Sequence, residues 1–136
     1  MSHPNSIIYK STKSFSPSDL ERLFLSVNWQ SGKYPDKLAT AIENYKTVFT
    51  AWDGDKLIGL ISAMDDTVMT AYIHYLLVDP EYQKLGVGRM LVEMIKIHYA
   101  DYLKIALIAE AEAIRFYERC GFELCETANP MYISKL

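Results

Sequence analysis

The chain has 136 residues, half of them hydrophobic and 23% charged, which is typical of a globular domain and excludes a disordered segment. Its net charge of −3 argues against nucleic acid as the main partner. The sequence has no apolar run of membrane-spanning length, no signal-peptide pattern at the N-terminus and no metal-binding pattern around its two cysteines. We therefore expect residues 1–136 to form a single cytoplasmic domain without a metal or a membrane partner.

The first third of the chain predicts one strand and two helices. Residues 7–10 form a short apolar run that indicates a strand. Ser16-Pro17-Ser18-Asp19 predicts a helix start, since Ser caps free N–H groups, Pro fits the first turn and the helix dipole favours an acid there. A loop at 28–34 and a second helix starting near Pro35 complete this part.

The middle of the chain predicts three antiparallel strands. Residues 48–52 and 56–64 predict two strands joined at Asp53-Gly54-Asp55, which is a strong signal for a hairpin turn. Residues 68–78 then predict a long strand. By the two-residue period, positions 72, 74, 76 and 78 share one face of that strand if no bulge interrupts it.

The last third predicts a helix, a nearly all-apolar strand of the buried parallel kind, a second helix closed by a glycine, and two short strands. These segments lie at 86–99, 103–109, 111–120, 122–126 and 131–134.

The loop that precedes the first of these helices is the most informative part of the chain. It runs Gln83-Lys84-Leu85-Gly86-Val87-Gly88-Arg89 between a strand and a helix N-terminus. Glycine lets the backbone approach a ligand, free N–H groups point at it, and the helix dipole favours negative charge. Lys84 and Arg89 add positive charge, so the loop predicts a phosphate or pyrophosphate site.

Two common phosphate loops do not match. The sequence contains no G-x-x-x-x-G-K-[ST], and the dinucleotide fingerprint G-x-G-x-x-G fails because Leu91 stands where its third glycine belongs. Residues 83–88 instead resemble the acyl-CoA pyrophosphate loop of the GNAT superfamily of N-acetyltransferases, Q/R-x-x-G-x-G/A. A second segment, residues 113–122, resembles the A-x-x-F-Y-x-x-x-G-F block of the same superfamily.

The resemblance implies an α/β GNAT fold. Such a fold has a mixed, mostly antiparallel sheet of about seven strands and four helices, with the fourth and fifth strands parallel and splayed apart. It also implies acetyl-CoA as co-substrate, with the pantetheine arm bonded to the backbones of Leu76 and Val78. The expected cofactor-binding residues are Leu76, Val78, Gln83, Lys84, Leu85, Gly86, Val87, Gly88, Arg89, Glu110 and Phe116.

Two side chains are candidates for proton transfer. Tyr117 matches the tyrosine that many family members place beside the CoA sulfur, and a phenol with a pKa of about 10 can protonate a leaving thiolate. The alternative is a packing tyrosine. His74 is the candidate general base because a histidine with a pKa near about 6.5 can accept a proton from an ammonium group. A hydrogen-bonded structural histidine is the equal alternative.

Glu110 departs from the family pattern, in which many relatives have an asparagine seven residues before the tyrosine. The sequence leaves three roles open for Glu110. It is an ordinary acid in the first turn of a helix, where the dipole favours it, or a catalytic base, or an anchor for an ammonium group. Aromatic walls for the acceptor are expected from Trp29, Tyr34 and Tyr72, with Tyr75 and Tyr132 as further candidates.

The sequence therefore predicts an N-acetyltransferase that acts on a small-molecule or peptide amine. The alternative is a non-catalytic acyl-CoA-binding sensor or partner module. A homodimer is a further expectation, because small family members are often dimers.

Overall fold

The computed structural model describes residues 6–13 and 15–136 of the chain. Its strands and α-helices follow one another as β1 (Ile7–Lys10), α1 (Pro17–Ser26), α2 (Pro35–Glu43), β2 (Thr47–Asp53), β3 (Lys56–Asp65), β4 (Thr70–Val78), α3 (Val87–His98), β5 (Lys104–Leu107) and α4 (Ile114–Arg119). Short 3₁₀ turns also occur at η2 (Gln30–Lys33), η3 (Pro80–Tyr82) and η4 (Ala111–Ala113).

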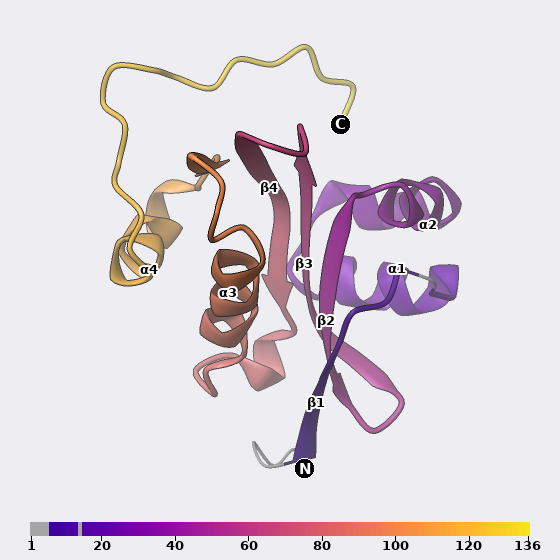
Figure 1. Ribbon diagram of the computed structural model, residues 1–136. Helices are drawn as coiled ribbons and strands as arrows, with labels where there is room; N and C mark the ends of the chain where they lie inside the picture. Colours follow the sequence, from indigo (N-terminus) through magenta and orange to yellow (C-terminus); the bar gives the residue numbers. More distant parts are fainter. Residues whose placement is uncertain (1–5, 14) are drawn as a thin grey trace.

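One sheet separates two layers of helices (Figure 1). Its strand order is β1-β2-β3-β4-β5, antiparallel except for the parallel pair β4–β5. Helices α1 and α2 cover one face, where Phe24, Ile42 and Leu60 belong to one buried cluster. Helices α3 and α4 lie on the other face, where Ile61 and Leu91 belong to a second cluster. The predicted α/β GNAT fold with a parallel fourth and fifth strand is confirmed.

Local chemistry explains most element boundaries. The Ser16 side chain accepts a hydrogen bond from Asp19 N–H and caps α1, as the sequence predicts. Gly54 at φ +60° lies in the two-residue turn between β2 and β3, where a left-handed conformation suits glycine. Gly121 at φ +99° closes α4, and Phe122 N–H donates to Tyr117 O behind it.

Strand β4 contains a bulge at His74. On β3 the neighbours Ser62 and Ala63 pair with Tyr75 and Ile73, so His74 is the extra residue. The bulge changes which face each side chain takes: Ile73 and Leu76 both pack in the α3 cluster although they are three positions apart, which in a regular strand would put them on opposite faces. The prediction that positions 72, 74, 76 and 78 share a face is therefore wrong, since the period of two does not hold across the bulge.

The parallel pairing of β4 with β5 is short. Thr70–Ile73 pairs with residues 104–107, and β4 continues to Val78 without β5 beside it. Beyond the bulge the two strands part, as the family resemblance implies. The predicted buried parallel strand at 103–109 is shorter and only half-buried, because β5 is the last strand of the sheet.

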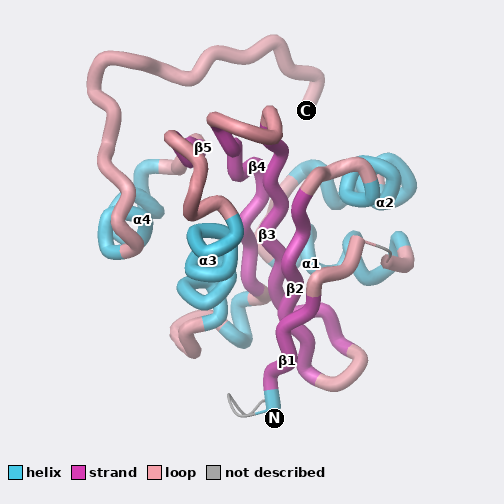
Figure 2. Tube along the Cα trace, viewed as in Figure 1, coloured by secondary structure: helices cyan, strands magenta, loops and turns pink. Residues whose placement is uncertain are grey.

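The two C-terminal strands predicted at 122–126 and 131–134 are not formed in the described residues, so the sheet has five strands instead of about seven. The segment after α4 runs as an extended loop across the top of the molecule (Figure 2). Met131, Tyr132 and Ile133 are largely exposed and contact the sheet too little to hold them as strands. Apolar residues in the sequence do not alone supply the burial that a strand requires.

Asp65 ties the end of β3 to the segment between α3 and β5. Its side chain is 1% exposed and accepts hydrogen bonds from Tyr99 Oη at 2.8 Å and Tyr102 Oη at 3.2 Å. Burial alone would raise the pKa of this carboxyl, but the bonds from Tyr99, Thr67 N–H and Tyr102 outweigh it and lower the pKa. The network fixes where β5 begins and therefore where it leaves β4.

We predict that Asp65→Ala lowers the free energy of unfolding by about 1–3 kcal/mol, because the buried Tyr99 hydroxyl and the half-buried Tyr102 hydroxyl each lose a carboxylate acceptor. Since the folded-state pKa is depressed, this contribution is full above about pH 4 and is lost as the pH falls further. Urea denaturation of both proteins at pH 7 and pH 3 measures the difference in the free energy of unfolding. Asp101→Ala, at an exposed position, is the control. Equal stability of wild type and Asp65→Ala at pH 7 would contradict this role.

Candidate functional site

The loop between β4 and α3 presents backbone N–H groups at a helix N-terminus. Gly86 is the N-cap of α3 in the left-handed conformation at φ +82°, and no side chain caps the helix there. The N–H groups of the first turn, residues 87–89, have no intrahelical acceptor in such a helix. Lys84 at φ +70° also turns the loop sharply. The loop has the geometry of an anion site.

A groove of about 600 Å³ begins at this loop and continues toward β4 and α4. The loop residues that line it are Gln83, Lys84, Gly86, Val87, Gly88 and Arg89. Leu76, Val78, Phe116 and Tyr117 line it farther along. The groove lining contains three cationic side chains, those of Lys84, Arg89 and Arg119, and one carboxylate, that of Glu112. The groove therefore suits a negatively charged ligand.

The backbones of Leu76 and Val78 face the open side of β4. Asp79 N–H donates to Ile58 O at 2.8 Å, so the pair 58–79 is a hydrogen-bonded pair of the β3–β4 ladder. Antiparallel pairs alternate, and Leu76 and Val78 therefore occupy non-hydrogen-bonded positions whose polar groups point away from β3. They point to the side from which β5 has departed.

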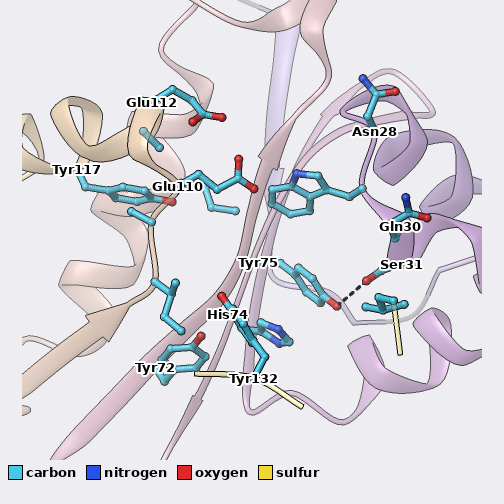
Figure 3. A pocket seen from close by; sticks show the side chains of 16 residues that line it. Asn28, Gln30, Ser31, Tyr72, His74, Tyr75, Glu110, Glu112, Tyr117 and Tyr132 are labelled. Atoms are coloured by element: carbon cyan, nitrogen blue, oxygen red, sulfur yellow. Dashed lines mark hydrogen bonds between the residues drawn. The ribbon is translucent and has the colours of Figure 1, made fainter. Parts of the chain in front are cut away.

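A second pocket of about 570 Å³ lies beside the groove (Figure 3). It is formed by the loop after α1, the bulged part of β4, the loop after β5, and the C-terminal segment. Trp29, Ser31, Tyr72, His74 and Tyr75 line it from the sheet and the α1 side. Glu110, Glu112 and Tyr132 are also in its wall.

Tyr117 lies where the two cavities meet, since it lines both, together with Trp29, Leu76 and Glu112. Burial, and the neighbouring Cys120, raise the pKa of the Tyr117 hydroxyl to about 12. The phenol therefore keeps its proton throughout the physiological pH range. A half-buried, protonated hydroxyl at this junction can donate a proton to a group that becomes basic there.

His74 is hydrogen-bonded to a buried tyrosine that the sequence did not predict as part of the site. Tyr45, the buried residue between α2 and β2, is hydrogen-bonded through its hydroxyl to His74 Nδ1. The Tyr75 ring stacks on the imidazole with centroids 4.2 Å apart. Burial lowers the pKa of His74, so the ring is neutral at pH 7. A neutral imidazole at a pocket wall has the protonation state that a base needs.

Glu110 and Glu112 approach each other on the opposite wall. The pKa of the Glu110 carboxyl is raised, because its protonated form can donate a hydrogen bond to Glu112 and because the negative charge of Glu112 disfavours ionisation. In Figure 3 the Glu110 and Tyr117 side chains both point toward the wall formed by Tyr75 and Ser31, whose hydroxyls are 3.2 Å apart. The described residues that line this pocket include two carboxylates and no Lys or Arg.

Most of the site residues predicted from the sequence come together, and three are placed differently. Tyr34, predicted as an acceptor wall, is 45% exposed and lies outside the pocket lining, because it starts α2 on the surface. Leu85 lies in the loop but outside the groove lining. Glu110, predicted to bind cofactor, lines the second pocket and not the groove.

Arg119 and Tyr45 were not predicted. Arg119 lies one helical turn after Phe116 on α4, so its place beside the groove follows the three-residue spacing. Tyr45 gives no local signal, because only the tertiary fold brings it to His74, 29 residues later.

Comparison with known proteins identifies a family. Residues 15–122 match the model of the acetyltransferase (GNAT) family. None of the helices in the described part of the chain is long and apolar enough to cross a membrane.

Two curated relatives are similar over most of the chain. GCN5-related N-acetyltransferase 2, chloroplastic, of Arabidopsis thaliana is 33% identical over 86% of the chain, which spans 54% of that protein. The uncharacterized N-acetyltransferase ycf52 of Gracilaria tenuistipitata var. liui is 34% identical over 76% of the chain and 60% of its own length. The chain thus spans little more than half the length of these relatives.

A solved GNAT family acetyltransferase from Streptococcus pneumoniae TIGR4 superposes with a TM-score of 0.81. It is 24% identical, and the match covers 96% of this chain and 99% of that one. At this identity the likeness establishes the shared fold.

The raised pKa of Tyr117 is directly measurable. With ¹³Cζ-labelled tyrosine, and with Tyr117→Phe to assign the signal, we predict that the Tyr117 resonance does not titrate until about pH 12. Free tyrosine in the same buffer titrates near about pH 10 and serves as reference. Ionisation of Tyr117 together with free tyrosine would mean that its hydroxyl is not buried as described.

Proposed function

The chain belongs to the GNAT family of acetyltransferases, and from this premise we propose that it transfers an acetyl group from acetyl-CoA to a primary amine. One observation supports the proposal most: a cationic groove and an acidic, aromatic pocket meet at Tyr117. The groove suits the anionic co-substrate, and the pocket suits a cationic amine.

The loop residues would hold the diphosphate of acetyl-CoA. The N–H groups of residues 87–89 and the positive end of α3 face the groove, and Lys84 and Arg89 add charge. A Cβ built on Gly86 would have no heavy atom of the described chain within 4 Å, so the space over it is available to a ligand. Phe116 and Val78 close the groove beside Gly88.

The free backbone edge of β4 would pair with the pantetheine arm. Leu76 and Val78 direct their polar groups to that edge, where the missing part of β5 leaves room. The Leu76 N–H also lies at the junction of the two cavities, where it can stabilise the carbonyl oxygen as negative charge develops. Holding both reactants at this junction can contribute roughly 7 kcal/mol to catalysis.

The chemistry needs three proton transfers: the ammonium loses one proton, the leaving thiolate gains one, and the attacking nitrogen loses a second proton as the amide forms, which restores the Tyr117 hydroxyl. Acetyl-CoA supplies an activated thioester, so the neutral amine attacks its carbonyl carbon directly and the C–S bond breaks. Tyr117 donates its proton to the leaving thiolate, and its buried hydroxyl is protonated at every physiological pH. His74, neutral at pH 7, accepts the proton that the ammonium substrate must lose, directly or through water.

The acceptor pocket favours a cationic amine without acidic groups. Glu110 and Glu112 attract an ammonium group, and the aromatic rings of Trp29, Tyr72 and Tyr75 add cation–π and apolar contact. Both a small molecule and a peptide side chain satisfy these requirements. A homodimer stays a prediction from the family resemblance, and a cytoplasmic location stays a prediction from the sequence alone; one relative is named as chloroplastic.

The cofactor loop is tested by Gly86→Val. We predict that this variant loses more than about 90% of CoA affinity in calorimetry, since a branched side chain blocks close approach of the ligand to the backbone. Gly54→Val is the matched control, because Gly54 also has a positive φ and open space around it but lies in the β2–β3 turn. Normal CoA binding by Gly86→Val would refute the placement of the diphosphate.

The general acid is tested by Tyr117→Phe. We predict a fall in kcat of about 10²–10³ with little change in CoA affinity, since the ring remains and only the proton donor is lost. An acceptor screen that detects thiol release supplies the assay, and Tyr34→Phe outside the pocket is the control. An unchanged kcat would remove Tyr117 from the reaction, and tight CoA binding without any turnover would favour a non-catalytic CoA-binding module.

A further inference from the structure

We propose that the C-terminal arm, residues 123–136, is exchanged between two copies of the chain, so that residues 131–134 of each copy pair with the open edge of β5 in the other. This contact concerns the assembly of the protein and goes beyond the proposed function. It also makes one wall of the acceptor pocket a contribution of the second copy.

The arm is not held by hydrogen bonds to its own chain. Phe122 N–H donates to Tyr117 O, and beyond that bond no backbone hydrogen bond among the described residues joins 123–136 to another element. The side-chain hydrogen bonds of the arm are local, since each joins residues two positions apart. The N–H and C=O groups of the arm are therefore available to another strand.

The arm carries apolar side chains on its outer face. Met131 and Ile133 are 91% and 104% exposed, whereas Tyr132 between them lines the acceptor pocket. This alternation is that of an extended strand with one face toward the protein and one face bare. Solvent-facing positions of a strand are normally polar, so a bare face of Met and Ile indicates a partner that covers it.

The outer edge of β5 is a second element without a partner. In the described part of the chain β5 pairs with β4 and with no other strand. Ile105 and Leu107 pack against the α3 side of the core but are only half-buried, and Leu103 just before the strand is exposed. An uncovered edge with apolar side chains is a template for another strand.

A second copy of the chain fits both elements. Within one molecule the arm leaves α4, crosses the top and ends on the side of β4 opposite to β5 (Figure 2). Its last ten residues, 127–136, reach about 33 Å when extended, which is enough to cross to a neighbouring molecule. One two-fold axis lets each arm cover the other copy's β5, so a single symmetric contact pairs both elements.

Pairing with β5 also gives each face of the arm a place. Met131 and Ile133 share one face of the exchanged strand and can cover the half-buried residues of β5 beside α3. Tyr132 then points to the opposite face, where Ile108 at the end of β5 lines the acceptor pocket. Each pocket receives Tyr132 from the other copy, and its wall is complete only in the dimer.

The test begins with the oligomeric state of the full chain, which we expect to be a dimer in sedimentation equilibrium. To identify the contact, ¹⁴N-labelled and ¹⁵N-labelled chains are mixed, unfolded, refolded together and treated with an amine-reactive cross-linker. Mass spectrometry should then show a link between Lys104 on β5 and Lys135 on the arm that joins one light and one heavy peptide.

The double variant Met131→Lys/Ile133→Lys should weaken dimerisation at least about tenfold and lose the mixed link, because lysines on a strand oppose edge pairing. Both side chains are exposed in the single chain, so we expect the variant to fold, and circular dichroism verifies this. Ile8→Lys is the control. It places a lysine at an exposed apolar position of β1, the opposite edge strand, and should leave the dimer intact.

A chain that stays monomeric at every concentration overturns the proposal. So does a dimer in which the Lys104–Lys135 link is absent or joins residues of one chain, since the arm then lies elsewhere or on its own β5. A dimer that Ile8→Lys dissociates and the arm variant does not is built on the other edge of the sheet, and overturns it as well. None of these measurements needs acetyl-CoA or an acceptor, so they decide the exchange even if the proposed acetylation fails.

Discussion

The separation of β4 from β5 is the constraint on which the rest of the structure depends. The strands pair only over residues 70–73 and 104–107, and the bulge at His74 begins where that pairing ends. One edge of β4 then has no strand partner at Leu76 and Val78, although the Gln83 side-chain amide donates to the Val78 carbonyl at 2.9 Å. The sheet opens there, between the glycine loop and α4. The buried Asp65 carboxylate holds the segment before β5 at the opposite, paired end of the two strands.

Two cavities of opposite charge follow from that opening. The groove receives its cations from the loop before α3 and from α4, whereas the pocket receives its carboxylates from the loop after β5. Both sets of side chains belong to backbone segments that are not paired with β4. Tyr117, on α4, contributes to the lining of both cavities. The fold therefore brings a cationic groove and an acidic pocket to one hydroxyl group, and partial burial keeps that hydroxyl protonated.

Features encoded in local sequence were predictable. Ser16 and Pro17 set the start of α1, Asp53-Gly54-Asp55 set the hairpin, and the glycines of residues 83–89 set the loop, since each depends on backbone conformation or capping within a few residues. The bulge at His74 was not predictable, because His and Tyr suit either face of a half-buried strand. The C-terminal segment has the apolar residues of a strand but lacks the burial, and Tyr45 contacts His74 across 29 residues of sequence.

The central claim is that the N–H groups at the start of α3 hold the diphosphate of coenzyme A while the open edge of β4 holds its pantetheine arm. A crystal structure with bound CoA tests it most directly. The account predicts diphosphate oxygens within hydrogen-bonding distance of the N–H groups of residues 84–89, and the thiol next to Tyr117. CoA bound elsewhere on the molecule, with this loop vacant or closed, would contradict it.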